Sequence, residues 1–489
     1  MIRFGPFQVD PRTWTLSRDG AAVDLSPRLV EILTHIVERN GEIVTKDELL
    51  ERFWPGVNIT ENTLTRAIAD IRKALADSAD SPKYLQTAAR RGYRFVGEPQ
   101  SQPDPGVRIP APDRDDPFQA WVKGKLALDS LDLKKLTGAI AAFERAVVEL
   151  PSYAPAHAGL ANAYLLQFEK TRSGSVPDRE LLTRAMAAAR QACALDPSLG
   201  EGWAVLGYLL GAAGKMEEAQ AAGRRASALE PDNWRHQYRL AYSAWGEERL
   251  RAVDKTLTLK PGFAPARMLS AMVFIARGAL DRAEREATLG ADAQRQHRHD
   301  HTPLPAVGLH WLRGLVLGAK GDLPAALASF EEEIAMGTSG HVYAREFAVN
   351  ARVAAGFTHL TLNDTPPAAA AFRQALAEAP GHPRATLGLH AVAARSGDRA
   401  GADATKAALE HAIGELSLGE RHSEAALVQA GRWIVRGQTA EAMDILDRLL
   451  TDAPPGPAGW IVPVDPMLAA LRFAPGRATL LARLAARAS

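Results

Sequence analysis

The stretch TENTLTRAIADIRKALADSADSPKYLQTAARRGYRF, residues Thr60–Phe95, decides the fold of the N-terminal part of the chain. Its first half begins with Thr60 as an N-cap and carries apolar residues at helical spacing, which predicts an amphipathic helix. Its second half has strand character on both sides of Arg91 and Gly92, and a glycine there suits a turn with positive φ. The stretch therefore predicts a helix followed by a β-hairpin. The apolar face of the helix comprises Leu64, Ile68, Ile71 and Leu75.

Two further helices are expected before this stretch. SPRLVEILTHIVERNG starts with Ser26 as N-cap and Pro27 at the first helical position, and it stops at an Asn-Gly pair. TKDELLERFW starts with Thr45 as N-cap, and Glu48 three residues later predicts a capping box. These two helices precede the amphipathic helix described above, so the N-terminal part should contain three helices.

Residues 1–25 read as short strands separated by turn signals such as Asp-Pro and Asp-Gly, which predicts a small antiparallel sheet. Strands, three helices and a terminal hairpin describe an α+β winged helix-turn-helix domain over residues 1–98. In such domains the third helix is the recognition helix, which enters the DNA major groove.

A proline-rich linker is expected over residues 99–117, because six prolines and few long apolar residues fall between Glu98 and Pro117. Alanine-rich helices follow it and end repeatedly in proline. Pro197, Pro231 and Pro261 are separated by 34 and 30 residues, and a period near 34 is typical of the tetratricopeptide repeat.

One repeat matches that pattern at nearly every offset, with Trp203, Leu206, Gly207, Leu210, Ala219, Ala226 and Pro231. Small residues let paired helices approach closely, and proline separates one helix from the next. We therefore expect an all-α solenoid of roughly nine degenerate repeats over residues 118–455, closed by an amphipathic pair of capping helices over 456–489.

Residues 1 to about 98 resemble the OmpR/PhoB-type effector domain, and most closely its CadC-, ToxR- and HilA-like branch, which carries the domain at the N-terminus. LSPRLVEIL, GEIVTKDELLERFWPG, ITENTLTRAIADIRKALAD and PKYLQTAARRGYRF occur in the family's order and spacing. The resemblance implies a reader of double-stranded DNA. It also implies that the loop Trp54–Ile59 contacts RNA polymerase. The later part resembles the tetratricopeptide family, which implies a concave surface for a peptide or partner protein.

The third helix offers side chains for both affinity and specificity toward DNA. Affinity comes from basic side chains against phosphates, whereas specificity needs side chains that reach base edges. Arg66 and Arg72 have the fork geometry for guanine or phosphate, and Lys73 suits phosphate. Asn62 and Thr65 can hydrogen-bond to bases or to the DNA backbone. The alternative interpretation is that these side chains form an ordinary solvated helix face.

The hairpin matches the wing of the OmpR/PhoB-type domains that this part of the chain resembles. In that family the wing reaches the minor groove or the flanking phosphates. The matching contact positions are Thr87, Arg90 and Arg91. Tyr93 and Phe95 are interpreted instead as core aromatics that anchor the hairpin, although Tyr93 also matches a contact position.

The charge of the chain is close to balanced. The formal net charge is +1, so bulk charge alone gives no affinity for polyanions. Acidic and basic residues are also equal in number over residues 1–98. We therefore expect a single domain to bind DNA weakly, and useful affinity to need a homodimer or tandem sites.

A groove in the repeat region is the second candidate site. Side chains at the second, fifth, ninth and twelfth places of each first helix share one face, and aromatic residues are frequent there. Such a groove suits a peptide or a small ligand, but the same aromatics could instead pack between repeats. The predicted groove residues are Asn162, Tyr208, Arg235, Tyr238, Tyr242, Trp245 and Trp311.

Other kinds of site receive little support. Cys193 is the single cysteine, which suits a reducing cytoplasm and a small buried side chain. His297, His299 and His301 alternate on an expected loop, which gives no fixed metal geometry. We find no phosphate-binding loop, nucleophile elbow or zinc-protease helix, so we expect no enzyme activity and no cofactor. Apolar runs fall short of the ~20 residues that span a bilayer, and a cytoplasmic protein without a membrane partner is expected.

These patterns favour a one-component transcription regulator, with a winged-helix DNA reader joined to a repeat domain that binds a partner, a ligand or a second protomer. One alternative is a tetratricopeptide scaffold whose winged helix no longer binds DNA. Another is an activator of the antibiotic-regulator type, which also joins such a reader to tetratricopeptide-like helices. The target genes and the signal are not encoded in any motif that we identify.

Overall fold

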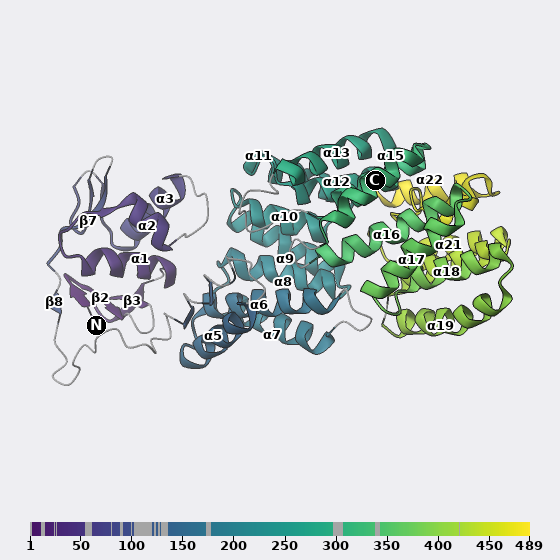
Figure 1. Cartoon of the computed structure of the whole chain (residues 1–489). Coiled ribbons are helices and arrows are strands. Elements are labelled where there is room, and N and C mark those ends of the chain that lie inside the picture. The colour runs from purple at the N-terminus through teal and green to yellow at the C-terminus, as the bar shows by residue number, and fades with distance from the viewer. Residues whose placement is uncertain are drawn as a thin grey trace. The chain divides into compact units, whose positions relative to one another are not determined.

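The computed structural model describes residues 2–10, 15–23, 25, 27–53, 61–79, 81–88, 91–98, 100–101, 120–121, 124–125, 128, 135–172, 178–296, 307–337, 343–419 and 421–489. The chain divides into two compact units (Figure 1). The first contains residues 1–129, 141–159 and 191–198, and the second contains residues 130–140, 160–190 and 199–489. The first unit holds all of the strands, and the second is built from helices.

An antiparallel sheet forms from the N-terminal strands, as predicted. Its order is β4-β3-β2-β1-β8, and alternate residues such as Phe7 and Val9 are buried on one face. The edge strand β8 pairs with Ile2 and Arg3, and both of its residues fall within the range predicted as linker, 99–117. The strand bounds are β1 (Ile2–Phe4), β2 (Phe7–Asp10), β3 (Thr15–Arg18), β4 (Ala21–Val23) and β8 (Gln100–Ser101).

Three helices follow, at the places the sequence predicts: α1 (Pro27–Glu38), α2 (Lys46–Phe53) and α3 (Glu61–Ala74). Pro27 opens α1, and the chain leaves that helix through Asn40 and Gly41, both with positive φ. Leu64, Ile68 and Ile71 on α3 are at most 1% exposed and pack in one apolar core with α1 and the strands. The predicted apolar face of the third helix is therefore confirmed.

The capping box predicted for α2 is half right. The backbone N–H of Glu48 donates to the Thr45 hydroxyl at 3.1 Å, as expected. The Glu48 carboxylate does not make the second bond of a capping box, to the Thr45 N–H. It instead accepts a hydrogen bond from Arg39 at 2.7 Å and contacts His35 at 3.1 Å. The side chain therefore ties α2 to α1.

A second, three-stranded sheet contains the wing. β5 (Val44–Thr45), β6 (Leu85–Ala88) and β7 (Gly92–Phe95) lie in the order β5-β7-β6. The prediction that Gly92 is a turn residue with positive φ is wrong: it is a strand residue opposite Thr45 and Ala88. A Cβ atom on Gly92 would lie 2.0 Å from the Val44 carbonyl oxygen, so this position needs glycine because β5 passes so close.

Tandem helical hairpins make up most of the remaining described chain, as the fold prediction states. From α8 onward each odd-numbered helix packs against the even-numbered helix before it, giving pairs from α8·α9 to α20·α21. The helices are α5 (Leu136–Glu149), α6 (Ala154–Arg172), α7 (Arg179–Leu195), α8 (Gly200–Ala212), α9 (Met216–Leu229), α10 (Trp234–Ser243), α11 (Gly246–Leu259), α12 (Ala264–Ala276), α13 (Leu280–Gln296), α14 (Leu309–Lys320), α15 (Leu323–Ala335), α16 (Ala344–Thr361), α17 (Thr365–Glu378), α18 (Pro383–Ser396), α19 (Arg399–Leu418), α20 (His422–Val435) and α21 (Thr439–Asp452).

The first helices of successive hairpins also contact one another, from α8·α10 through α18·α20. We call the surface made by this row of even-numbered helices the first-helix face. Small residues permit the packing, as expected: Phe372 on α17 is fully buried, and its ring lies directly against Gly356 and Gly388 on the two neighbouring first helices. A Cβ at Gly388 would lie 2.3 Å from that ring.

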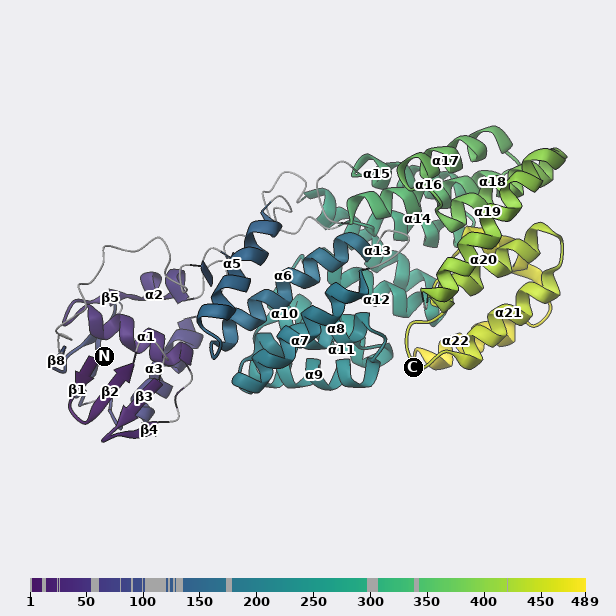
Figure 2. The ribbon, with the colours of Figure 1, turned by 90° about the horizontal axis from the view of Figure 1, so that it is seen from below.

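The C-terminal residues differ from the predicted pair of capping α-helices. Residues Pro466–Phe473 form a 3-10 helix, η1, and only Arg477–Arg487, α22, is α-helical. η1 contacts α14, α16 and α20, and α22 contacts α12. α22 thus contacts both α12 and α21, although these two helices are far apart in the sequence, and Figure 2 shows α22 beside α21. These residues lie along the solenoid as well as at its end.

Candidate nucleic-acid interface

The helix α3 turns its polar side away from the core. Its apolar residues are buried, whereas Thr65 and Lys73 are exposed. The backbone of Asn62 and Arg66 belongs to α3, but their side chains lie outside the described part of the structure. Of the three predicted α3 side chains that the structure describes, Thr65, Arg72 and Lys73, two are therefore exposed.

Arg72 behaves differently from its predicted role as a free DNA contact. Its Nε donates to the Leu85 carbonyl oxygen at 3.3 Å, and its Nη2 donates to the same oxygen at 2.9 Å. Nη2 also donates to the Thr87 hydroxyl at 2.8 Å. The guanidinium therefore joins α3 to the wing strand β6, and the sequence offered no signal for a contact between residues that far apart.

The turn of the wing presents Arg91 to solvent. Its backbone is fixed on both sides, because its N–H donates to the Ala88 carbonyl oxygen at 2.9 Å and its own carbonyl oxygen accepts from Lys46 N–H at 3.0 Å. Thr87 is also exposed. Arg90 lies outside the described residues. A fixed backbone with an exposed cation suits contact with a phosphate.

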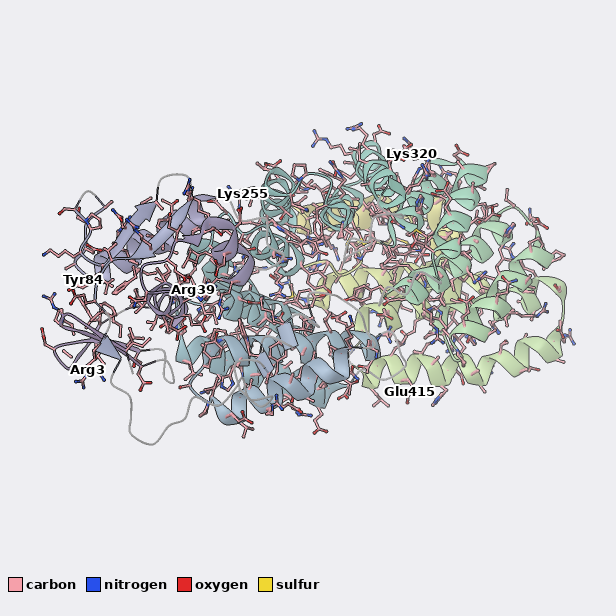
Figure 3. The ribbon with its side chains drawn as sticks, turned by 60° about the vertical axis from the view of Figure 1, so that its left-hand side comes forward. Arg3, Arg39, Tyr84, Lys255, Lys320 and Glu415 are labelled. Carbon is pink, nitrogen blue, oxygen red and sulfur yellow. The ribbon has the colours of Figure 1, made fainter. Side chains whose placement is uncertain are left out.

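The base of the wing is anchored by aromatic residues, as predicted for Tyr93 and Phe95, which are 4% and 1% exposed. The Phe95 ring packs edge-on against Phe4 at a centroid separation of 5.0 Å. Tyr84, labelled in Figure 3, lies 5.5 Å from both Phe4 and Phe7. The wing is therefore held to the N-terminal sheet by a shared aromatic cluster.

Asp77 is a structural residue that the sequence analysis missed. Its carboxylate accepts backbone hydrogen bonds from Ser78, Lys83, Tyr84 and Leu85, at distances of 2.7 to 3.0 Å. Burial alone would raise the pKa of Asp77, but these four N–H groups lower it below its ordinary value. The residue fixes the path from α3 into β6. An aspartate just after a helix end was the only sequence signal.

The loop Trp54–Ile59, predicted to contact RNA polymerase, lies outside the described residues, as do His297, His299 and His301. Among the residues that are described, no group of three or more His, Cys, Asp or Glu side chains could hold a metal ion. None of the described helices is both long enough and apolar enough to cross a membrane.

In the repeat region, the predicted groove residue Asn162 is 8% exposed and joins two hairpins. Its amide donates to Glu201 at 3.1 Å, and its carbonyl oxygen accepts from Arg239 at 2.6 Å. Burial lowers the pKa of Arg239, while the Glu201 carboxylate opposes that shift. Arg239 was not predicted as a groove residue, because it lies one place beyond Tyr238 in the periodic pattern.

Three predicted aromatics adjoin this network. The rings of Tyr208 and Tyr242 stack at a centroid separation of 4.2 Å, with an interplanar angle of 15°. Tyr238 packs edge-on against Phe263 at 5.0 Å, and burial raises its pKa. These three tyrosines are half-buried, so they both join repeats and keep an accessible edge. Arg235 is also half-buried, with its guanidinium 4.9 Å above the Trp234 ring.

Two groove predictions need correction. Trp311 is 8% exposed and packs against Phe347 and Trp460, so it is a core residue. Trp245 lies outside α10 as the N-cap of α11, and its ring stacks under the Arg249 guanidinium at 4.6 Å. Helix α10 ends two residues earlier than the repeat pattern requires, which removes Trp245 from the expected face.

Arg249 is a buried cation that no motif indicated. It is 3% exposed and donates to the carbonyl oxygens of Ala241, Tyr242 and Ala244 at the end of α10, at 2.8 to 3.0 Å. Burial lowers its pKa to about 10. The carbonyls at a helix C-terminus carry partial negative charge, which stabilises a cation there. Arg249 therefore caps α10.

The winged-helix part of the chain matches a known family. The family model described as "Transcriptional regulatory protein, C terminal" matches residues 20–95. These residues form an OmpR/PhoB-type DNA-binding domain of the kind found in transcriptional regulators. With the tandem hairpins that follow, the chain combines this domain with a tetratricopeptide-like helical region.

The similarity to characterised proteins covers this domain. The transcriptional activator CadC of Escherichia coli is 34% identical over 97 residues, which are 20% of this chain and 19% of that protein. The transcriptional regulator HilA of Salmonella typhimurium is 33% identical over 95 residues, 18% of this chain and 17% of that protein. The chain therefore matches about a fifth of the length of these curated relatives.

Some solved structures resemble the winged-helix domain, and others resemble the helical repeat region. The DNA-binding domain of E. coli CadC is 31% identical, with a TM-score of 0.19, and the match covers 21% of this chain and 95% of that one. The Klebsiella pneumoniae RstA DNA-binding domain, solved in complex with the RstA box, is 29% identical with a TM-score of 0.18, over 19% of this chain and 93% of that one. A tetratricopeptide repeat protein from Parabacteroides merdae is 15% identical with a TM-score of 0.38, over 60% of this chain and 99% of that one.

Proposed function

We propose that this protein is a sequence-specific transcriptional regulator in which α3 reads DNA bases and the wing holds the phosphate backbone. The observation that carries the proposal is the Arg72 contact, which joins α3 to β6 within an OmpR/PhoB-type domain. Because the two elements are held together, exposed groups on both can meet one DNA surface without first being ordered.

The predicted contacts divide into two roles. Asn62, Thr65 and Arg66 at the start of α3 are proposed to face base edges, where forked and amide side chains discriminate between bases. Lys73, Arg90 and Arg91 are proposed to neutralise phosphates, which gives affinity without sequence preference. Thr87 and Arg72 are proposed chiefly to set the spacing between the helix and the wing.

The repeat region is proposed to bind a protein or peptide partner, a ligand or a second protomer. The half-buried tyrosines of α8 and α10 support this role, since aromatic side chains with a free edge are common in binding surfaces. A homodimer would supply the second domain that a charge-balanced reader needs. Contact between the Trp54–Ile59 loop and RNA polymerase is proposed from the family resemblance alone.

Genome-wide mapping of bound sites with the full chain tests the proposal. We expect discrete bound sites that share a short sequence repeated once or more, and their loss in an Arg66→Ala variant that still folds. A purified chain that binds no genomic fragment even at low salt, where the electrostatic contribution is largest, would support the scaffold alternative instead.

A further inference from the structure

Residues 459–473, with the sequence GWIVPVDPMLAALRF, lie across the first-helix face of the last four hairpins. η1 contacts α14, α16 and α20, and Asp465 pairs with Arg384 on α18. The segment thus meets the first helix of four successive hairpins. We call these residues the C-terminal segment.

The apolar side chains of the segment are buried. Ile461, Val462, Val464, Met467, Leu468 and Leu471 are between 3% and 7% exposed. Met467 fits a notch in α20 that depends on Gly431, because a Cβ there would lie 3.0 Å from the Met467 sulfur. Trp460 packs edge-on against Trp311 of α14 at a centroid separation of 6.4 Å. The contact has the features of a bound apolar peptide.

One ion pair lies within this apolar contact. The Asp465 side chain is 0% exposed and the Arg384 side chain 21% exposed, and the two form a direct salt bridge. Asp465 also accepts a hydrogen bond from Met467 N–H at 3.0 Å. A buried carboxylate that loses its cation is strongly disfavoured, so this pair fixes which residue of the segment sits over α18.

The segment is not built like the hairpins that it covers. It consists of turns and a 3-10 helix, and Gly459 at its start and Gly476, three residues beyond its end, have positive φ. A cavity of about 240 Å³ is lined by Pro463 of the segment, by residues of α22 and by the residues at the end of α12. Side chains therefore hold the segment on the first-helix face, and the packing beside it is incomplete.

We propose that the C-terminal segment is a built-in occupant of the first-helix face, and that α14 to α20 form a docking surface for a partner segment of the same chemistry. That partner is an extended apolar stretch of another protein carrying one carboxylate for Arg384. Because the segment buries six apolar side chains, it opens only briefly by itself, and a competitor must bury similar side chains to hold the face in its place. The inference goes beyond the proposed function, in which the partner-binding residues lie on α8 and α10.

Exchanging the charges of Arg384 and Asp465 tests whether an added peptide can replace the chain's own C-terminal segment. In the full chain with Arg384→Asp, the new carboxylate repels that of Asp465. This variant is titrated with two labelled peptides of residues 457–476, one of natural sequence and one carrying Asp465→Arg. We expect the variant to bind the arginine peptide, and to bind the natural peptide about thirtyfold or more weakly. The wild-type chain should not bind the arginine peptide.

A variant that keeps its helical content but binds neither peptide, or binds both equally, would overturn the proposal. Should Arg384→Asp fail to fold, hydrogen exchange of the wild-type chain decides: amides of residues 466–473 should exchange about tenfold faster than those of α16. Equal exchange would show that the segment opens only with the whole region, and would reject the proposal. DNA binding by the wild-type chain, measured separately, bears on the proposed function and not on this inference.

Discussion

The guanidinium of Arg72 in α3 donates a 2.8 Å hydrogen bond to the hydroxyl of Thr87 in β6. With its bonds to the Leu85 carbonyl oxygen, this side chain fixes the distance between the helix and the wing. Asp77 fixes the chain path between the same two elements. Side-chain hydrogen bonds therefore hold α3 and β6 together in the absence of DNA.

Replacing Arg72 with Met should loosen the wing. Hydrogen bonds from charged groups contribute about 1.5–3 kcal/mol, and because Arg72 is only half-buried we expect the domain to lose about 1–2 kcal/mol of unfolding free energy. Urea unfolding gives the stability, and amide exchange of β6 and β7 gives the local effect. Thr87→Val removes only one of the bonds and should cost less. Unchanged exchange in the hairpin of Arg72→Met would refute this coupling.

His382 should make the repeat region less stable in acid. Its Nδ1 accepts the Ala385 N–H at the start of α18, and burial, followed by Arg384 and Arg421, lowers its pKa to about 4. The unfolded histidine titrates near 6.5, so stability is full above about pH 6.5 and falls as the pH drops toward 4, by on the order of 1–3 kcal/mol. Urea unfolding at pH 7 and at pH 5 measures this loss.

His382→Asn is the matched control for that titration. Asparagine can also accept the N–H at a helix start but does not titrate, so the loss between pH 7 and pH 5 should become smaller. If the variant and the wild type lose equal stability, other groups cause the acid sensitivity.

Gly388→Ala should destabilise the repeat region. The added methyl group would lie 2.3 Å from the buried Phe372 ring, and overpacking of this kind costs about 1–3 kcal/mol. Gly414→Ala on α19 is the control, because a Cβ there has no atom within 4 Å and alanine favours the helix. Thermal unfolding should separate the two variants, and equal midpoints would contradict the packing described for Phe372.

Local patterns in the sequence predicted the elements and their buried faces. The helical spacing of Leu64, Ile68 and Ile71 and the anchoring role of Phe95 are confirmed, because burial of a helix face or strand residue follows from its own neighbours along the chain. The small residues that admit Phe372 follow the repeat pattern in the same way.

Contacts between distant residues could not be predicted. Arg72 looked like a free cation because its acceptors lie in another element, and Gly92 looked like a turn because the approach of Val44 is tertiary. Trp311 fitted the groove pattern, but its partner Trp460 comes from the C-terminal segment. That segment was predicted as part of an amphipathic pair of capping helices, and nothing local showed which surface it covers.

Replacing both Arg90 and Arg91 with Ala should weaken binding to all DNA sequences alike. Each phosphate contact removed should reduce the slope of log affinity against log salt by about 1, so we expect the slope to fall by about 2. Titrations at several salt concentrations, with a specific and a nonspecific duplex, measure it. Loss of affinity for the specific duplex alone would make the wing a base reader.

The central claim is that α3 reads DNA, and Arg66→Ala tests it most directly. The measurement is an anisotropy titration of the full chain against a mapped site and against the same site with one base pair changed. We expect the variant to keep its unfolding midpoint, to lose about 1–3 kcal/mol of affinity for the mapped site and to discriminate less between the two duplexes. A binding curve unchanged from that of the wild type would contradict it.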